Sequence, residues 1–106
     1  MDMIDMDKLL AFCDGDAELA MSVLEMFRKE AEVALVEMPG LYESGKMDML
    51  SNSVHKLKSH CRYVGADQLA DLAQSIENQA DNGNSEKLND QLSGFYSGLR
   101  AVLSSF

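Results

Sequence analysis

The sequence is poor in several residue types, and each shortage narrows what the protein can be. Its 106 residues include no tryptophan, one proline and two cysteines. A chain of this length has room for one hydrophobic core, so we expect a single domain over residues 1–106. The chain has no need of a disulfide staple, and we expect Cys13 and Cys61 to be buried thiols.

Long apolar runs are also missing. No run approaches the roughly 20 residues that a membrane-spanning helix needs. The acidic first residues lack the basic and apolar regions of a signal peptide, so we expect a cytoplasmic protein.

Basic residues are scarce. Nine Lys and Arg stand against 18 Asp and Glu, which gives a formal net charge of −9. Such a surface repels nucleic-acid phosphates and anionic lipid, so we expect neither a nucleic-acid nor a membrane partner. Lys56, Lys58 and Arg62 nevertheless fall within seven positions. This cluster is either a solvated helix face or a site for a local negative charge.

The apolar periodicity is helical along the whole chain, without a convincing strand pattern. It predicts a short helix over about 5–13, then a second that Asp14 or Asp16 caps and Ser44–Gly45 closes. Pro39 predicts a kink or an early stop in this second helix. Its inner stripe is expected to hold Leu19, Val23, Met26, Phe27, Ala34, Leu35 and Met38.

Three further helices are predicted, over about 47–64, over about 67–81 and from 85 to the C-terminus. Gly65 is placed to end the first of them, and 82–84 form a turn. The expected inner stripes of the last two are Leu69, Leu72, Ala73 and Ile76, and Leu88, Leu92, Phe95, Leu99, Val102 and Phe106. Four long helices with short loops predict an all-α, antiparallel up-down four-helix bundle with an additional short N-terminal helix. They can close a bundle within one chain, so we expect a monomer.

His55 lies at the centre of a polar face on the helix predicted over 47–64. At about 100° per residue, the apolar stripe falls on the opposite side, at Leu50, Val54, Leu57, Cys61 and Val64. Within roughly 60° of His55 lie Asp48, Ser51, Asn52, Lys58, Ser59 and Arg62. This placement argues against a core histidine and leaves an ordinary surface histidine as the plain alternative.

The neighbours of His55 suit a different role. An exposed imidazole is a competent nucleophile at neutral pH, because its unperturbed pKa of about 6.5 leaves a neutral fraction. Lys58, three residues on, can offset the charge of a phosphoryl group on the ring. Ser59, four residues on, is small enough to let another protein approach. The face therefore combines a nucleophile, a cation and open space.

The run 55–69 resembles the signature of histidine-containing phosphotransfer (HPt) domains of two-component phosphorelays. That signature reads His-x-Leu-Lys-small and then Gly-Ala-x-x-Leu, with the glycine ten residues after the histidine. The matching residues are His55, Leu57, Lys58, Ser59, Gly65, Ala66 and Leu69. Leu72, Ile76 and Glu77 also resemble the next helix of the family, whereas His60 and Cys61 depart from its usual small residues.

The resemblance implies that His55 accepts the phosphoryl group, Lys58 balances its charge and Ser59 admits the partner. It implies a carrier without kinase activity of its own. The donor would be the phospho-aspartate of one response-regulator receiver domain and the acceptor would be another receiver domain, with one of the two receivers in a hybrid sensor kinase. The receiver would supply Mg²⁺, and we expect no cofactor or metal on this chain. The expected partner-binding residues around the histidine are Ser51, Asn52, Lys56 and Arg62.

Three rival interpretations remain open. A metal-binding bundle would use His55, His60 and Cys61, but their spacing does not share one face and Glu-x-x-His pairs are absent. A helical interaction module without transfer is the main alternative, and the intact His55, Lys58 and Ser59 argue against it. A sensor-kinase dimerisation domain would build its bundle from two chains. We expect His60 to pack or to hydrogen-bond to a neighbouring helix.

Overall fold

A computed structural model describes residues 4–83 and 85–105 of the chain. The described residues form five helices and no strand: α1 (Met6–Phe12), α2 (Ala17–Glu43), α3 (Met47–Tyr63), α4 (Asp67–Asn82) and α5 (Ser85–Leu103). All five predicted helices are present, with ends that differ from the prediction by only a few residues. The predicted turn residue Asn84 and the predicted stripe residue Phe106 lie outside the described residues.

Side chains that precede α1 and α2 satisfy the free N–H groups of their first turns. Asp5 Oδ1 accepts hydrogen bonds from the backbone N–H groups of Asp7 and Lys8, at 3.1 and 3.2 Å. Asp16 Oδ1 accepts one from Leu19 N–H at 3.1 Å. Of the two predicted caps for the second helix, the structure thus selects Asp16. An acceptor side chain at this position stabilises a helix typically by about 1 kcal/mol.

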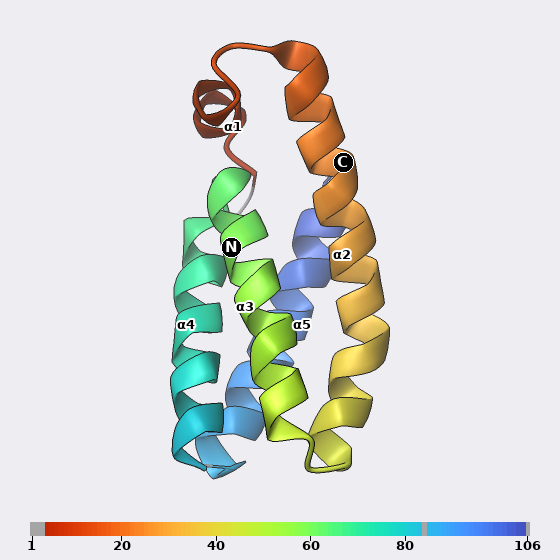
Figure 1. Cartoon of the computed structure of the whole chain (residues 1–106), viewed down its shortest axis with the longest axis vertical. Coiled ribbons are helices and arrows are strands. Elements are labelled where there is room, and N and C mark those ends of the chain that lie inside the picture. The colour runs from red at the N-terminus through yellow and green to blue at the C-terminus, as the bar shows by residue number, and fades with distance from the viewer. Residues whose placement is uncertain (1–3, 84, 106) are drawn as a thin grey trace.

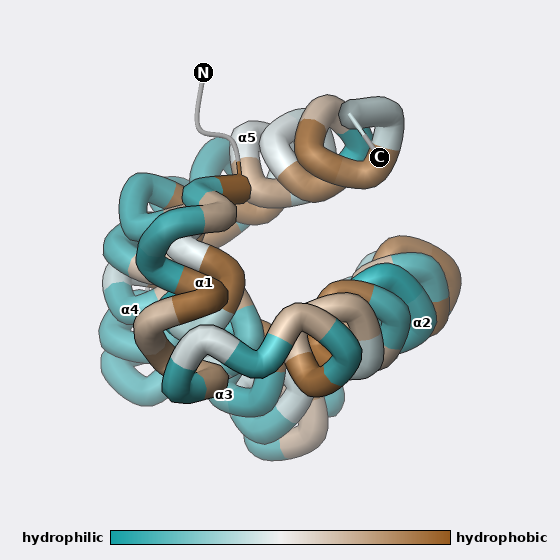
Figure 2. Tube along the Cα trace, turned by 90° about the horizontal axis from the view of Figure 1, so that it is seen from above, coloured by the Kyte–Doolittle hydropathy of each residue, from teal (hydrophilic) through white to brown (hydrophobic). Residues whose placement is uncertain are grey.

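The four long helices lie along the long axis of the molecule, and their connections alternate between its two ends (Figure 1). α2 contacts α3 and α5, and α4 contacts both α3 and α5. α1 crosses one end, where it contacts α2 and α3 (Figure 2). The backbone N–H of Asp5 donates to the carbonyl of Val64 at 2.9 Å, which fixes the start of α1 at the end of α3.

The interior follows the predicted stripes on α3 and α5. Leu50, Val54, Leu57, Cys61 and Val64 are all buried, as are Leu88, Leu92, Phe95, Leu99 and Val102. On α4, Leu69, Ala73 and Ile76 are buried, and Leu72 packs against the core while remaining half-buried. Because the core of α3 is fixed on one side, its opposite face, which carries His55, is turned outward.

The predicted stripe on α2 is partly wrong. Leu19 and Met26 are exposed, while the core side is occupied by Ala20, Phe27, Ala31, Ala34 and Met38. Three of the buried residues of α2 are alanines. Leu19 and Met26 each precede a buried residue by one position, so their side chains are rotated about 100° around the helix, away from the core. Hydrophobicity alone favours burial of the larger side chains, whereas the face of α2 that packs on α3 and α5 buries several alanines instead.

Of the kink or early stop predicted at Pro39, the early stop is wrong, because α2 continues to Glu43. A proline inside a helix removes one backbone hydrogen bond and crowds the preceding turn. Here it lies in the last two turns, directly after Met38, which is fully buried. Packing of this segment against the core holds the helix beyond the proline.

Both cysteines are buried thiols, as predicted. Among the described helices, none combines the length and apolar composition needed to cross a bilayer.

Gly65 adopts a left-handed backbone conformation and also lets Asp5 approach closely. Substitutions at two glycines separate these two effects. Gly65 and Gly83 both have positive φ angles, of 79° and 71°. A Cβ on Gly83 would meet nothing within 4 Å, whereas one on Gly65 would lie 2.5 Å from Asp5 Cβ. We expect Gly83→Ala to lower the Tm by about 5 °C, through the left-handed backbone alone. Gly65→Ala should lower it by about 10 °C or more, since it also displaces α1. Equal losses in thermal unfolding would show that the close approach of Asp5 contributes nothing.

Candidate functional site

His55 projects from the outward face of α3, as predicted. Its side chain is 62% exposed. Among the described residues, one side chain holds the ring: Nδ1 lies 3.1 Å from Oε2 of Glu77 on α4. The second ring nitrogen, Nε2, is separated from Nδ1 by one carbon and is not the atom that contacts Glu77. An exposed ring held at one nitrogen leaves the other available to a partner protein.

Glu77 joins His55 to Lys58 across the contact between α3 and α4. Its Oε1 lies 2.8 Å from Lys58 Nζ, and both side chains are only 14% exposed. Lys58 Nζ also donates to Oε1 of Gln74 at 2.9 Å, and Gln74 Nε2 donates to Oδ1 of Asn78 at 3.1 Å. His55 and Lys58 lie nearly one turn apart on α3, and this set of α4 side chains fixes both.

The ionisation of Glu77 determines which ring nitrogen carries the proton. Burial raises the pKa of the Glu77 carboxyl. The hydrogen bonds and charges of Lys58 and His55 together lower this pKa by more than burial raises it, so the net pKa lies below its usual range. An ionised carboxylate can only accept hydrogen bonds, so Nδ1 of His55 is the donor. In the neutral ring, Nε2 then carries the lone pair. This arrangement leaves Nε2 with a lone pair that can act as a nucleophile.

Ser59 follows His55 by one helical turn and adds little bulk beside the ring. It is half-buried. Its Oγ faces the carbonyl of His55 at 3.5 Å, the upper limit of a hydrogen bond, so the hydroxyl turns toward its own helix. A larger side chain here would extend into the space beside the imidazole.

The predicted basic cluster is largely neutralised by α4. Lys58 pairs with Glu77, and Arg62 Nη2 lies 3.8 Å from Oδ1 of Asp71. Lys56 is exposed and takes part in no ion pair among residues 4–83 and 85–105. Two of the three cations in the cluster are thus paired with carboxylates of α4. The spacing of residues along α3 could not predict these pairs, because both carboxylates come from α4.

The remaining predicted partner-binding residues flank His55 on opposite sides. Ser51 Oγ donates to Oδ1 of Asp81 on α4 at 3.3 Å. Asn52 is exposed and lines a shallow groove between α2 and α3, together with Val33 and Met49. The structure thus places Ser51 toward α4 and Asn52 toward α2, with the imidazole between them.

His60 and Cys61 do not share the face of His55. His60 is half-buried, its Nδ1 is buried without a hydrogen bond among the described residues, and its ring meets Tyr63 edge-on at 6.1 Å. Cys61 belongs to the core. Tyr63 belongs to α3 itself, so the contact expected between His60 and a neighbouring helix stays a prediction. In the part of the chain that the structure describes, no group of three or more His, Cys, Asp or Glu could hold a metal ion.

Glu77 is the site residue to which sequence reasoning assigned no role. A usable signal was present, because Glu77 directly follows the core residue Ile76 and one turn separates it from the core residue Ala73. A carboxylate so close to an apolar stripe has to be paired when its helix packs against another. The identity of its partners depends on the register between α3 and α4.

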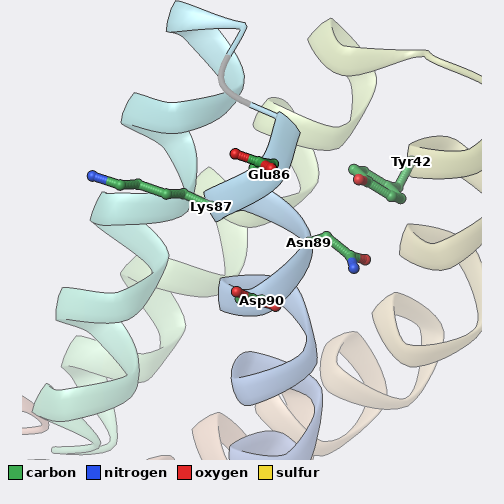
Figure 3. Close-up of a pocket in the computed structure, with 5 residues that line it drawn as sticks. All are labelled: Tyr42, Glu86, Lys87, Asn89 and Asp90. Atoms are coloured by element: carbon green, nitrogen blue, oxygen red, sulfur yellow. The ribbon is translucent and has the colours of Figure 1, made fainter.

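An open pocket lies apart from this face, between α2 and the first turns of α5. It is lined by Tyr42, Glu86, Lys87, Asn89 and Asp90 (Figure 3). None of these residues comes from α3, which carries His55. The His55 side chain is 62% exposed on the outward face of α3, where a protein surface can reach it.

Comparison with known proteins agrees with the geometry of this face. The Hpt domain family matches residues 22–105, which is most of the chain and includes His55, Lys58 and Glu77. No curated protein and no solved structure that we compared matches the chain.

The chain belongs to the Hpt domain family. Hpt domains are phosphocarrier modules rather than kinases, and they interact with receiver domains in two-component signalling. The protein is thus a histidine phosphotransfer domain of a two-component phosphorelay.

Proposed function

We propose that His55 carries the phosphoryl group, accepting it from the phospho-aspartate of one receiver domain and passing it to another. The observation that carries this proposal is the contact of Glu77 with Nδ1, which leaves Nε2 as an exposed nucleophile. His60, the only other histidine, is half-buried beside Tyr63.

The proposed transfer balances without loss of a proton. Nε2 of His55 attacks phosphorus, the N–P bond forms, and the O–P bond of the acyl phosphate breaks to release the aspartate carboxylate. Nδ1 keeps its proton, so the ring gains positive charge while it carries the phosphoryl group. The carboxylate of Glu77, 3.1 Å from Nδ1, stabilises that charge. Return of the group to a second receiver reverses these steps.

Lys58 is proposed to stabilise the phosphorylated state. In the unphosphorylated domain its ammonium is held by Glu77 and Gln74. A phosphoryl group on Nε2 brings close to two negative charges to the same face, and Lys58 can share its donors with a phosphate oxygen. Because α4 already holds the side chain near His55, little conformational freedom is lost when that contact forms.

Lys58→Ala should slow acceptance of phosphate by about five- to tenfold without abolishing it. The lost contact is worth on the order of 1 kcal/mol, because the phosphate itself stands in water and salt. The rate is measured as transfer from a phosphorylated receiver at low and high ionic strength, and the wild-type advantage should shrink with salt. Lys56→Ala is the matched control, since Lys56 is exposed and lies about 100° around α3 from His55. Equal rates for wild type and Lys58→Ala at low salt would contradict the assignment.

The partners follow from the same chemistry. We propose that response-regulator receivers, one of them in a hybrid sensor kinase, exchange the phosphoryl group with His55, and that Mg²⁺ is bound by the receiver. Residues 1–106 are proposed to act as one monomeric, cytoplasmic domain. Helix connections at alternate ends support an antiparallel up-down four-helix bundle as its scaffold.

Incubation with a panel of phosphorylated receivers tests the proposal as a whole. At least one receiver should label the wild-type domain, and a second receiver should remove the label. A domain that binds receivers but never takes up phosphate would instead be an interaction module without transfer.

A further inference from the structure

Two aromatic side chains stack on each other at the surface, near the end of α3. The ring centroids of Phe12, the last residue of α1, and Tyr63, the last residue of α3, are 4.4 Å apart, and their planes differ by 14°. Phe12 is 53% exposed and Tyr63 is 37% exposed. Soluble proteins normally cover such rings, and exposed aromatic anchors are typical of the centres of protein interfaces.

The stacked pair lies close to the phosphoryl-accepting face. Tyr63 follows His55 by eight residues on the same helix, which places it about 12 Å along α3 and about 80° around it. Phe12 covers it from α1. A partner standing over Nε2 of His55 therefore approaches both rings.

The pair is also rigidly placed. Asp5 N–H donates to the carbonyl of Val64 at 2.9 Å, and Lys8 forms an ion pair with Asp67 at the start of α4. Gly65 lets the backbone of Asp5 approach closely. α1 is thus attached on both sides of the turn between α3 and α4, so Phe12 keeps its position relative to His55. A preorganised anchor loses little entropy on binding.

The shared family region covers one ring of the pair and not the other. Residues 22–105 match the Hpt domain family, which includes His55 and Tyr63 but leaves out all of α1. The proposed transfer chemistry lies entirely within the matched part. A contact made through Phe12 would therefore add to partner choice without entering the reaction.

We propose that the Phe12–Tyr63 pair is an apolar anchor for the docked receiver domain, and that α1 thereby takes part in selecting the receiver. This proposal rests on the proposed function of His55. A stable protein interface covers about 800 Å² on each partner, which corresponds to a disc about 16 Å in radius. A disc of this size centred on His55 includes Tyr63, about 12 Å away along α3, and reaches the stacked Phe12. The matching receiver would present an apolar socket beside its phospho-aspartate.

Transfer from a receiver that labels the wild-type domain tests the anchor. Phe12→Ser and Tyr63→Ser should each slow transfer about tenfold at low receiver concentration, with recovery at saturation, because docking and not chemistry is weakened. Phe12→Tyr keeps the stack and should retain most of the rate. Val36→Ser is the matched control: Val36 is 79% exposed, and it lies about 160° around α2 from the core residue Ala20. Wild-type transfer by both serine variants, at every receiver concentration, would overturn the proposal.

A small-molecule donor separates this outcome from failure of the proposed function. Phosphoramidate phosphorylates histidine without docking, so it should label wild type and both serine variants equally. If no receiver labels the wild-type domain, the proposed function itself fails. Sedimentation of the same variants shows whether a second copy of this chain, rather than a receiver, covers the Phe12–Tyr63 pair. If wild type is a dimer that Phe12→Ser dissociates while transfer is unchanged, the pair is a self-association surface and the proposal is overturned.

Discussion

His55→Gln is expected to abolish phosphorylation of the domain by receivers and by phosphoramidate alike. The substitution removes Nε2, the proposed nucleophile, and glutamine offers no atom of comparable reactivity. Folding should be nearly unaffected, with a change in unfolding free energy within about 0.5 kcal/mol, because the side chain is 62% exposed. Radiolabel transfer and thermal unfolding of the same preparation measure the two effects.

His60→Gln is the control for this experiment, because it alters the other histidine of the chain and leaves the exposed face intact. It should still accept phosphate. The wild-type label should be labile in acid and stable in base, as expected for an N–P bond. Label at wild-type level in His55→Gln would place the acceptor elsewhere in the domain.

Ser59→Arg should reduce transfer from receivers by about thirtyfold or more, the second largest effect that we expect. A long cationic side chain one turn from His55 would occupy the space beside the imidazole and block a docked protein, which corresponds to about 2 kcal/mol of lost transition-state binding. The half-buried serine makes only a long contact with the carbonyl of His55, at 3.5 Å, so stability should change little.

Two comparisons show whether Ser59→Arg acts on docking. Ser59→Ala should transfer at close to the wild-type rate, because it adds no bulk. Phosphoramidate should label Ser59→Arg almost as fast as wild type, since a small donor avoids the added side chain. Receiver-induced NMR shifts centred on α5, rather than on α3 and its neighbours, would contradict this docking face.

The sequence by itself determined which face of α3 is exposed. Leu50, Val54 and Leu57 recur at helical spacing, so burying them turns His55 outward whatever the neighbouring helices are. Local signals likewise predicted most helix ends to within a few residues, because caps and left-handed glycines such as Gly65 act through backbone groups nearby, although the structure had to decide between Asp14 and Asp16.

Tertiary packing decided what the sequence left open. The stripe on α2 was misplaced at Leu19 and Met26, because the neighbours of a helix select between a large side chain and an adjacent alanine. The same holds for charge, because the spacing of residues along α3 does not show that Glu77 of α4 pairs with Lys58. Glu77 also reaches Nδ1 of His55 from 22 residues further along the chain. Periodicity along one helix contains no information on the register between two helices, and that register determines which nitrogen of His55 contacts Glu77.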